Sequence, residues 1–288
     1  MSRHSIMRRK NLIDILFKYF GLFCTLLGLI ILMIFIFNIT RQGLGRINWE
    51  FLTNLPSRIP ERAGIYTAIA GTLWIMVLTS LIAIPLGIGA GIYLEEYGKK
   101  NRFAKIVELN ITNLAGVPSI IYGLLGLEIF GRILNLQGSL LAGSATLALL
   151  IVPIIVVSTR ESLKAVPKTI REASYALGAS KFQTIRFALI PASISGIITG
   201  IILAISRAVG EAAPLIVIGA LAYVPFVPTG PASEFTVLPI QIFNWVSRPQ
   251  HGFMINASAA IIIMLLITFL FNSIAVYLRL KRQKYSKW

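Results

Sequence analysis

The sequence is poor in acidic residues and in the residues that most often carry chemistry. Asp and Glu together supply 11 of 288 residues, and there are two histidines and one cysteine. A single cysteine, Cys24, excludes a disulfide within the chain and a cysteine-cluster metal site. His4 and His251 lie outside the long apolar runs, which contain no paired-Asp, Ser/His or His-x-x-x-His arrangement. We therefore expect no enzymatic chemistry within those runs and no metal or cofactor bound by this chain.

Apolar residues, in contrast, make up 56% of the chain and charged residues only 13%, where soluble domains carry about a quarter. The apolar residues fall into six blocks, each long enough to cross a hydrocarbon core of about 30 Å as a helix. We expect spans at about 19–39, 66–94, 110–133, 139–158, 193–222 and 255–279. The sequence thus predicts an all-α integral membrane protein, with one transmembrane domain over 20–280 between an N-terminal segment 1–19 and a C-terminal tail 281–288.

The basic residues are divided unevenly between the two sides of these spans. The segments 1–19, 95–109, 159–191 and 279–288 hold 20 Lys and Arg, the alternate connections hold six, and Arg207 lies inside a block. Because basic connections stay inside, both termini and the segments 95–109 and 159–191 are expected in the cytoplasm, with the protein in the plasma membrane. This division among span flanks also argues against nucleic acid as the reason for the net charge of +16.

The first block follows basic residues, as the apolar part of a signal peptide would. Its run from Tyr19 to Ile39 is longer than the roughly 7–15 residues usual there, and no small-x-small cleavage site follows at once. We expect it to be retained as the first span.

The polar segment 159–191 is predicted to fold as a helical hairpin. Pro167 suits the first turn of a helix, and Gly178 suits the position after its end, where φ is positive. Ser180 and Gln183 form the capping box that begins a second helix. Pro191 would then open the fifth span.

One face of this hairpin carries a narrow stripe of apolar residues. Ile170, Ala173 and Leu177 recur at helical spacing. An amphipathic hairpin lying on lipid is one interpretation, but the stripe is small and weakly hydrophobic for that purpose. We favour docking into a groove of another protein.

The same hairpin contains the run R-E-A-S-Y-A-L-G, residues 171–178, followed thirteen residues after the glycine by Pro191. This run resembles the EAA loop of ABC importer permeases, which reads E-A-A, three residues, G, nine residues, then I-x-L-P. Four positions are in register, namely Glu172, Ala173, Gly178 and Pro191. Three depart from the pattern, namely Ser174, Ala188 and Ile190. The resemblance implies that this loop contacts a separate ATPase through Glu172, Ala173, Tyr175, Leu177 and Gly178.

Two charged residues, Arg207 and Glu211, lie inside the fifth block. Arg207 is fourteen residues beyond Ser193, about 21 Å along a helix and so near the middle of the membrane. A charge there costs at least ~2.5–3.5 kcal/mol, and residues four apart can pair on one helix face. A bundle-stabilising ion pair is one interpretation. We favour a pathway site for an anion, formed with Ser206, because intramembrane ionisable groups usually line pathways and Arg binds tetrahedral oxyanions bidentately.

Glu128 and Arg132 are also four residues apart, near the outer end of the third block. Their position favours a pair that reaches the membrane interface over a second anion site.

Further stretches resemble the phosphate-specific ABC permeases, namely residues 85–97, 115–124 and 206–215. Ala213, Pro214 and Leu215 follow the A-type pattern R-A-x-G-E-T-A-P-L, and Ala212 replaces its threonine. The resemblance implies a six-helix, type I importer-like permease with a cytoplasmic coupling helix that conducts inorganic phosphate. It also implies a C-type permease paralogue as heterodimer partner, an ATPase dimer and an extracytoplasmic phosphate-binding protein. ATP and Mg²⁺ would act in the ATPase, because this chain has no G-x-x-x-x-G-K-[ST] loop.

Two other functions remain open at this point. A sulfate- or molybdate-type permease is the first, but Glu211 suits phosphate better because phosphate carries a proton that a carboxylate can accept in a hydrogen bond. An ion-coupled secondary transporter is the second. It would leave the hairpin without a purpose, and the paired broken helices of inverted repeats are not seen in the sequence.

The connection 223–254 is proline-rich and includes Phe243 and Trp245. These aromatic residues suit either the membrane interface or a docking surface for an extracytoplasmic partner, and the sequence does not separate the two.

The orientation can be tested by cysteine labelling. In a Cys24→Ser background, Tyr175→Cys should be inaccessible to a membrane-impermeant thiol reagent added outside intact cells and should react after permeabilisation, because the charge asymmetry places the hairpin in the cytoplasm. Labelling of Cys at position 175 in intact cells would overturn the assignment.

Overall fold

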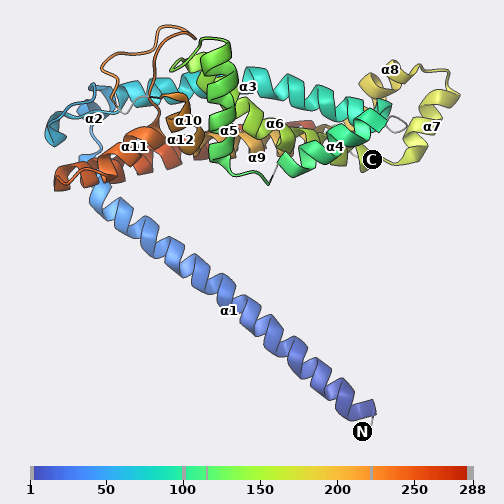
Figure 1. Ribbon diagram of the computed structural model, residues 1–288. Coiled ribbons are helices and arrows are strands. Elements are labelled where there is room, and N and C mark those ends of the chain that lie inside the picture. Colours follow the sequence, from blue (N-terminus) through green and yellow to red (C-terminus); the bar gives the residue numbers. More distant parts are fainter. Residues whose placement is uncertain (1–2, 99–101, 115, 221–222, 284–288) are drawn as a thin grey trace.

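The computed structural model describes residues 3–98, 102–114, 116–220 and 223–283, and these form an elongated helical bundle with one helix standing apart from it (Figure 1). Outside the described residues lie 1–2, 99–101 and 284–288, which belong to the expected cytoplasmic segments. Residues 115 and 221–222, which belong to expected spans, also lie outside them. No strand occurs in the described ranges, where Ser139 and Glu234 form an isolated antiparallel bridge. The all-α fold class is therefore confirmed.

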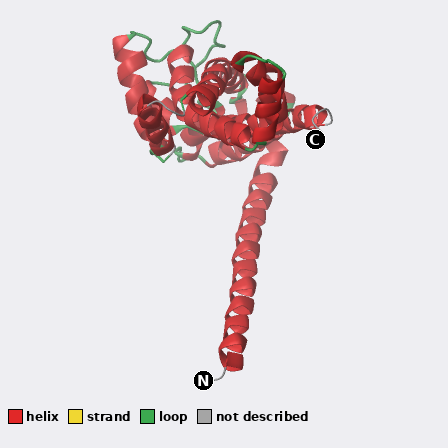
Figure 2. Cartoon of the chain, turned by 90° about the vertical axis from the view of Figure 1, so that its right-hand side faces the viewer, coloured by secondary structure: helices red, strands yellow, loops and turns green. Residues whose placement is uncertain are grey.

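Five helical stretches have the length and hydropathy of a membrane span, at 14–46, 66–97, 140–164, 181–209 and 251–281. They overlap α1 (Arg3–Gly43), α3 (Tyr66–Ile92), α6 (Leu140–Lys164), α9 (Ile190–Val209) and α12 (His251–Gln283). These correspond to the first, second, fourth, fifth and sixth blocks of the sequence. Seen from the side of α7 and α8, α1 departs from the gathered helices of the body (Figure 2).

The third block does not form the continuous span that was expected at 110–133. α4 (Arg102–Leu114) ends before Pro118, whose ψ of 137° is not helical, and α5 (Ser119–Gly126) continues into the π-helical η4 (Leu127–Ile133). Proline disfavours a helical conformation of the residue before it, which interrupts the block. The stretch after Pro118 is roughly 22 Å long and lies across the direction of α3 (Figure 1).

The fifth block also differs from its expected bounds. α8 (Lys181–Thr184), the π-helical η5 (Ile185–Leu189) and α9 form one continuous helix, so Pro191 does not open a new one. The widened turn accommodates the proline, which lacks an N–H, and the N–H of Ile190 bonds Ile185 O five residues back. The helix ends at Val209, and α10 (Ala213–Ile218) follows after a short break.

α6 lies between α3 and α9 and is the most buried of the long helices. On one face, Gly87 and Gly91 of α3 meet Ile155 and Thr159 of α6, and a Cβ on either glycine would lie 2.6 Å from the facing Cβ. On another face of α6, Ser158 and Ser162 meet Gly200 and Gly196 of α9. Both glycine pairs have the four-residue spacing that allows membrane helices to approach closely.

The end of the bundle opposite α7 and α8 is closed by η1 (Leu44–Arg46), α2 (Trp49–Thr53), η2 (Pro60–Arg62) and α11 (Leu238–Val246). The guanidinium of Arg46 lies over the Phe51 ring and donates to the carbonyl oxygens of Glu61 and Ala63 at 2.8 and 3.1 Å. Trp245 is buried against Phe51, so neither interpretation of this residue as a surface aromatic holds.

The glycine contacts predict a sharp difference between two substitutions on the same helix. Gly91→Ala would press a methyl group against Thr159 and should lower the free energy of unfolding by ~1–3 kcal/mol. Gly89→Ala is the matched control, because no atom lies within 4 Å of its Cβ position. Thermal unfolding of the two purified variants measures this, and equal midpoints would contradict the close packing of α3 on α6.

Candidate functional site

Arg207 and Glu211 form the ion pair that their spacing predicted, but they do so across the end of a helix. Arg207 lies in the last turn of α9, and Glu211 lies in the break before α10. Arg207 Nε is 3.3 Å from Glu211 Oε1, with 40% and 19% of the two side chains exposed. The N–H groups of Gly210 and Glu211 bond the carbonyl oxygens three residues back, which tightens the chain at this point. Both charged groups thus sit where the helix stops.

Ser206 lies in the seam between α9 and α12. Its Oγ is 2.5 Å from Asn272 Oδ1 and 2.7 Å from Ile202 O. The hydroxyl is therefore engaged between two helices, and no contact joins it to Glu211 among the bonds of the described residues. Its part in a substrate pathway stays a prediction.

A tyrosine that the sequence reasoning missed lies near this pair. Tyr122 on α5 is buried, and its hydroxyl donates to Leu114 O at 2.7 Å. The next residue, Gly123, packs so closely on α10 that a Cβ there would lie 2.8 Å from Pro214 Cα. The sequence feature that could have identified Tyr122 is its position directly before a glycine in the stretch 115–124, which resembles the phosphate-specific permeases.

α10 begins without a side-chain cap. Ala212 occupies the N-cap position, and the N–H groups of Leu215 and Ile216 bond its carbonyl oxygen. A threonine there, as in the pattern that this segment resembles, could cap the helix through its hydroxyl. The substitution removes that option and leaves Glu211 as the polar side chain of the break.

The hairpin at the other end of α9 follows the local signals in the sequence. α7 (Lys168–Ala176) ends at Leu177, and Gly178 has a φ of 78°. Ser180 Oγ accepts from the Gln183 N–H at 3.3 Å, and Gln183 Oε1 accepts from the Ser180 N–H at 2.7 Å, which completes the capping box. The predicted helix, turn and helix are confirmed.

The outward surface of the hairpin includes several large exposed apolar side chains. Leu177 is 89% exposed, Phe187 71%, Phe182 64% and Tyr175 45%, and Glu172, Ala173 and Gly178 are also exposed. Ile170 instead packs inward on Leu163, Val166, Ile185 and Leu189. The expected stripe is thus divided, with Ile170 holding α7 to the body while Ala173 and Leu177 face away from it.

Ser174, which departs from the E-A-A pattern, joins the two helices of the hairpin. Its hydroxyl lies 2.9 Å from that of Thr184, which is buried. A hydroxyl pair in this position fixes the angle between α7 and α8 by a directional bond rather than by apolar contact alone.

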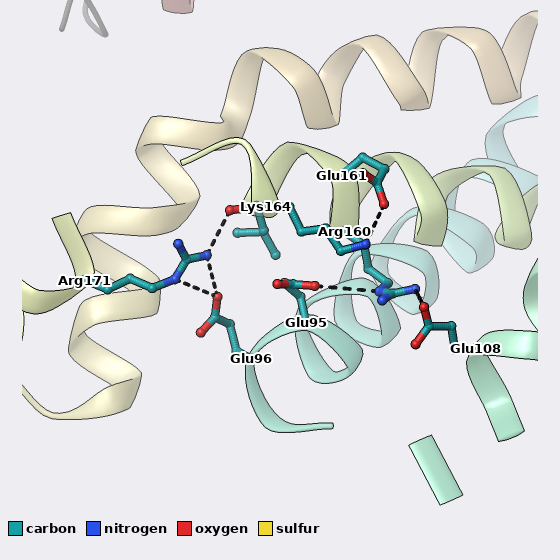
Figure 3. A network of polar contacts seen from close by, with 8 residues as sticks. Glu95, Glu96, Glu108, Arg160, Glu161, Lys164 and Arg171 are labelled. Atoms are coloured by element: carbon teal, nitrogen blue, oxygen red, sulfur yellow. Dashed lines mark hydrogen bonds and ion pairs between the residues drawn. The ribbon is translucent and has the colours of Figure 1, made fainter. Parts of the chain in front are cut away.

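A network of charged side chains attaches α7 to the rest of the bundle (Figure 3). Arg171 donates from Nε and Nη2 to Glu96 Oε1 at 3.2 and 2.9 Å, and to Val166 O and Leu163 O at 3.0 and 2.9 Å. Glu96 belongs to η3 (Tyr93–Tyr97), the π-helical continuation of α3.

The residue beside Glu96 extends this network to α6. Arg160 of α6 lies 3.9 Å from Glu95 and 2.8 Å from Glu108 of α4. Sequence reasoning did not select these residues. The sequence feature that could have identified them is the pair of acidic residues at the end of an apolar block. This pair faces a strongly basic segment of the chain.

A cavity of about 340 Å³ lies beside this network, lined by Glu95, Lys164, Lys168, Arg171, Glu172 and Tyr175. It separates much of α7 from the ends of α3 and α6. On this side α7 is therefore attached through Arg171 rather than through continuous packing.

Comparison with known proteins places this architecture in a family. Residues 83–284 match the family described as binding-protein-dependent transport system inner membrane component. The phosphate transport system permease protein PstA of Yersinia pestis is 35% identical over 87% of this chain and 84% of its own length. The probable ABC transporter permease protein YqgI of Bacillus subtilis is 31% identical over 87% and 90%.

Solved structures share the fold. The chain resembles a chain of a bacterial alginate ABC transporter crystallised with its alginate-bound periplasmic protein, with a TM-score of 0.65 and 16% identity over 99% of this chain and 98% of that one. It also resembles a chain of the inward-facing methionine ABC transporter MetNI, with a TM-score of 0.59 and 17% identity over 76% and 94%.

Proposed function

This chain belongs to the family of binding-protein-dependent transport system inner membrane components, and we propose how its two sites serve that role. It is the transmembrane permease subunit of an ATP-driven importer of inorganic phosphate, a multi-pass protein of the inner membrane. The relatives named for phosphate transport support this substrate. The observation that carries the proposal is the pair of Arg207 and Glu211 at the end of α9.

Arg207 is the group that binds the phosphate anion. Its guanidinium is permanently charged and presents parallel N–H donors that match two oxygens of a tetrahedral oxyanion. The single bond to Glu211 runs through Nε, and 40% of the side chain is exposed within this chain, so terminal N–H groups remain for an anion. Glu211 accepts a hydrogen bond from a protonated phosphate oxygen, which an unprotonated sulfate could not donate. Ser206 lines the same path beside Arg207.

The exposed face of the hairpin binds the ATPase. Tyr175, Leu177, Phe182 and Phe187 are exposed in the part of the chain that the structure describes, and a helix with such a face fits a hydrophobic groove of a partner. A dimer of ATPase subunits binds ATP and Mg²⁺ there and closes on ATP binding. That closure displaces the hairpin and switches the bundle between inward-open and outward-open states.

The remaining partners follow from the family. A C-type permease paralogue completes the pathway beside this chain, and an extracytoplasmic phosphate-binding protein delivers the anion to the end formed by α2 and α11. Both termini and the hairpin lie in the cytoplasm. A secondary carrier driven by ions is disfavoured, because it would leave the exposed face of the hairpin without a partner.

The turn at Gly178 provides a test of the docking role. Gly178→Val forces a β-branched residue to a positive φ, which costs at least ~1–2 kcal/mol and deforms the hairpin. We expect phosphate uptake per assembled complex to fall about tenfold. Gly178→Asn is the control, because asparagine tolerates this conformation. Wild-type uptake by Gly178→Val at equal membrane abundance would contradict docking through the hairpin.

The anion site is tested by removing the charges at α9. Arg207→Gln should abolish phosphate uptake while the complex assembles. Because 40% of Arg207 is exposed, the cost of leaving Glu211 unpaired should stay below the ~3–5 kcal/mol of a fully buried pair. The double variant Arg207→Gln/Glu211→Gln leaves no lone charge and should assemble normally but remain inactive.

The matched control for that double variant is Glu128→Gln/Arg132→Gln, which removes a second pair of the same spacing, exposed and 2.9 Å long. It should keep wild-type uptake. Near-normal uptake by the Arg207 and Glu211 double variant would show that the pair only stabilises the bundle.

A further inference from the structure

We propose that η3, the π-helical end of α3, transmits the movement of the hairpin into the membrane bundle, with Glu96 and Tyr97 as positioning residues. The inference rests on the proposed function, because it assigns a path to the movement that an ATPase would impose. It concerns residues of this chain that bind neither the substrate nor the ATPase.

Three consecutive side chains of η3 contact three different helices. Glu95 faces Arg160 of α6 at 3.9 Å, and Glu96 accepts from Arg171 of α7 at 2.9 Å. The ring of Tyr97 lies 4.2 Å from Nζ of Lys181, the first residue of α8. The hairpin therefore holds η3 through both of its helices, while α6 holds the same segment from the bundle.

The contact between Arg171 and Glu96 is suited to transmit displacement. Nε and Nη2 of the guanidinium bond one carboxylate oxygen, Nη2 also donates to Leu163 O in the last turn of α6, and Nη1 donates to Val166 O just beyond that helix. Only 14% of the Arg171 side chain and 6% of the Glu96 side chain are exposed. A planar guanidinium that donates from all three of its nitrogens and is shielded from water has little freedom to move.

Stability alone explains this arrangement poorly. Removing two charges from water is costly, so a buried ion pair contributes little net free energy of folding compared with apolar residues of similar volume. What such a pair provides is a fixed geometry. The pair of Glu128 and Arg132 is equally short but 56% and 67% exposed, and it joins residues of one helical turn rather than two separate helices.

The π-helical turn itself lies where the movement would pass. The N–H of Gly98 bonds Tyr93 O five residues back, and π-helical turns are rare and frequently occur at functional sites. Beyond η3, α3 is bound to α6 at Gly87 and Gly91. A cavity of about 440 Å³ is lined by α3 residues together with Ile205 of α9 and Phe271 of α12, and Ile205 lies two residues before Arg207. Displacement of η3 can therefore change the spacing of α3 and α9 at the anion site.

The first experiment cuts the contact and restores it covalently in the assembled importer with its partner permease, ATPase and binding protein. In a Cys24→Ser background, Glu96→Cys/Arg171→Cys should hydrolyse ATP but import at least about tenfold less phosphate per ATP than the parent. Bridging the two thiols with a short bis-methanethiosulfonate should recover most of that loss. Normal phosphate import per ATP before bridging, or no recovery after it, would overturn the proposal.

Two controls separate coupling from folding. Glu128→Cys/Arg132→Cys should keep the parent ratio with and without the bridging reagent, because its ion pair is exposed and confined to one helix. Tyr97→Phe keeps the ring over which Lys181 lies and should match the parent, whereas Tyr97→Leu should import less phosphate per ATP. Equal ratios for these two variants would remove Tyr97 from the path.

A second measurement decides the proposal without phosphate. Spin labels at Leu86→Cys on α3 and Leu266→Cys on α12, both exposed, should change their separation when ATP binds to the parent complex. Glu96→Gln should lose that change while keeping ATP binding. An unchanged response in Glu96→Gln would refute transmission through η3, whereas a responsive parent that imports no phosphate would refute only the substrate assignment.

Discussion

Glycines on α3 and α9 let both helices approach α6 so closely that side chains of α6 touch the backbone of its neighbours. This close packing sets the positions of the two candidate sites, the hairpin and the Arg207–Glu211 pair. In a bilayer, where apolar surfaces gain little by leaving lipid for each other, such contacts and the hydrogen bonds between helices hold a bundle together. α9 carries the hairpin at one end and Arg207 at the other, and α3 ends in η3 against the hairpin. The proposed anion site and the proposed coupling surface thus lie at the two ends of α9, which packs with α3 on α6.

Proline shows where reasoning from the sequence fails for the fold. Pro85, Pro153 and Pro191 all lie inside continuous helices, while Pro118 separates α4 from α5. A count of apolar residues cannot distinguish these cases. Whether the helix continues depends on what replaces the backbone hydrogen bond that proline cannot donate. Before Pro191 the helix adopts a wider, π-helical turn and continues. At Pro118 the helix stops, and the carbonyl oxygen of Leu114 accepts a hydrogen bond from Tyr122 of the following helix. The length and number of the apolar blocks were predictable, but the course of the third was not.

The same distinction applies to the sites. The turn at Gly178, the capping box of Ser180 and the pairing of Arg207 with Glu211 join residues within four positions, so the sequence predicts them from local geometry. The contact of Arg171 with Glu96 joins residues 75 positions apart, and Gly123 meets Pro214 only because α5 packs on α10. Such contacts depend on the helix arrangement, which the pattern of one sequence does not contain.

The isolation of α1 has a consequence for how the protein is made. None of the most apolar part of α1 is buried by other described residues, whereas 67% of the most apolar part of α6 is. α1 can therefore leave the insertion machinery as soon as it is synthesised, since lipid alone satisfies its surface. α6 gains α9 as a neighbour only when α9 has been translated, so the glycine-lined seam between these two helices closes late. During that interval α1, which needs only lipid around it, anchors the unfinished chain in the membrane.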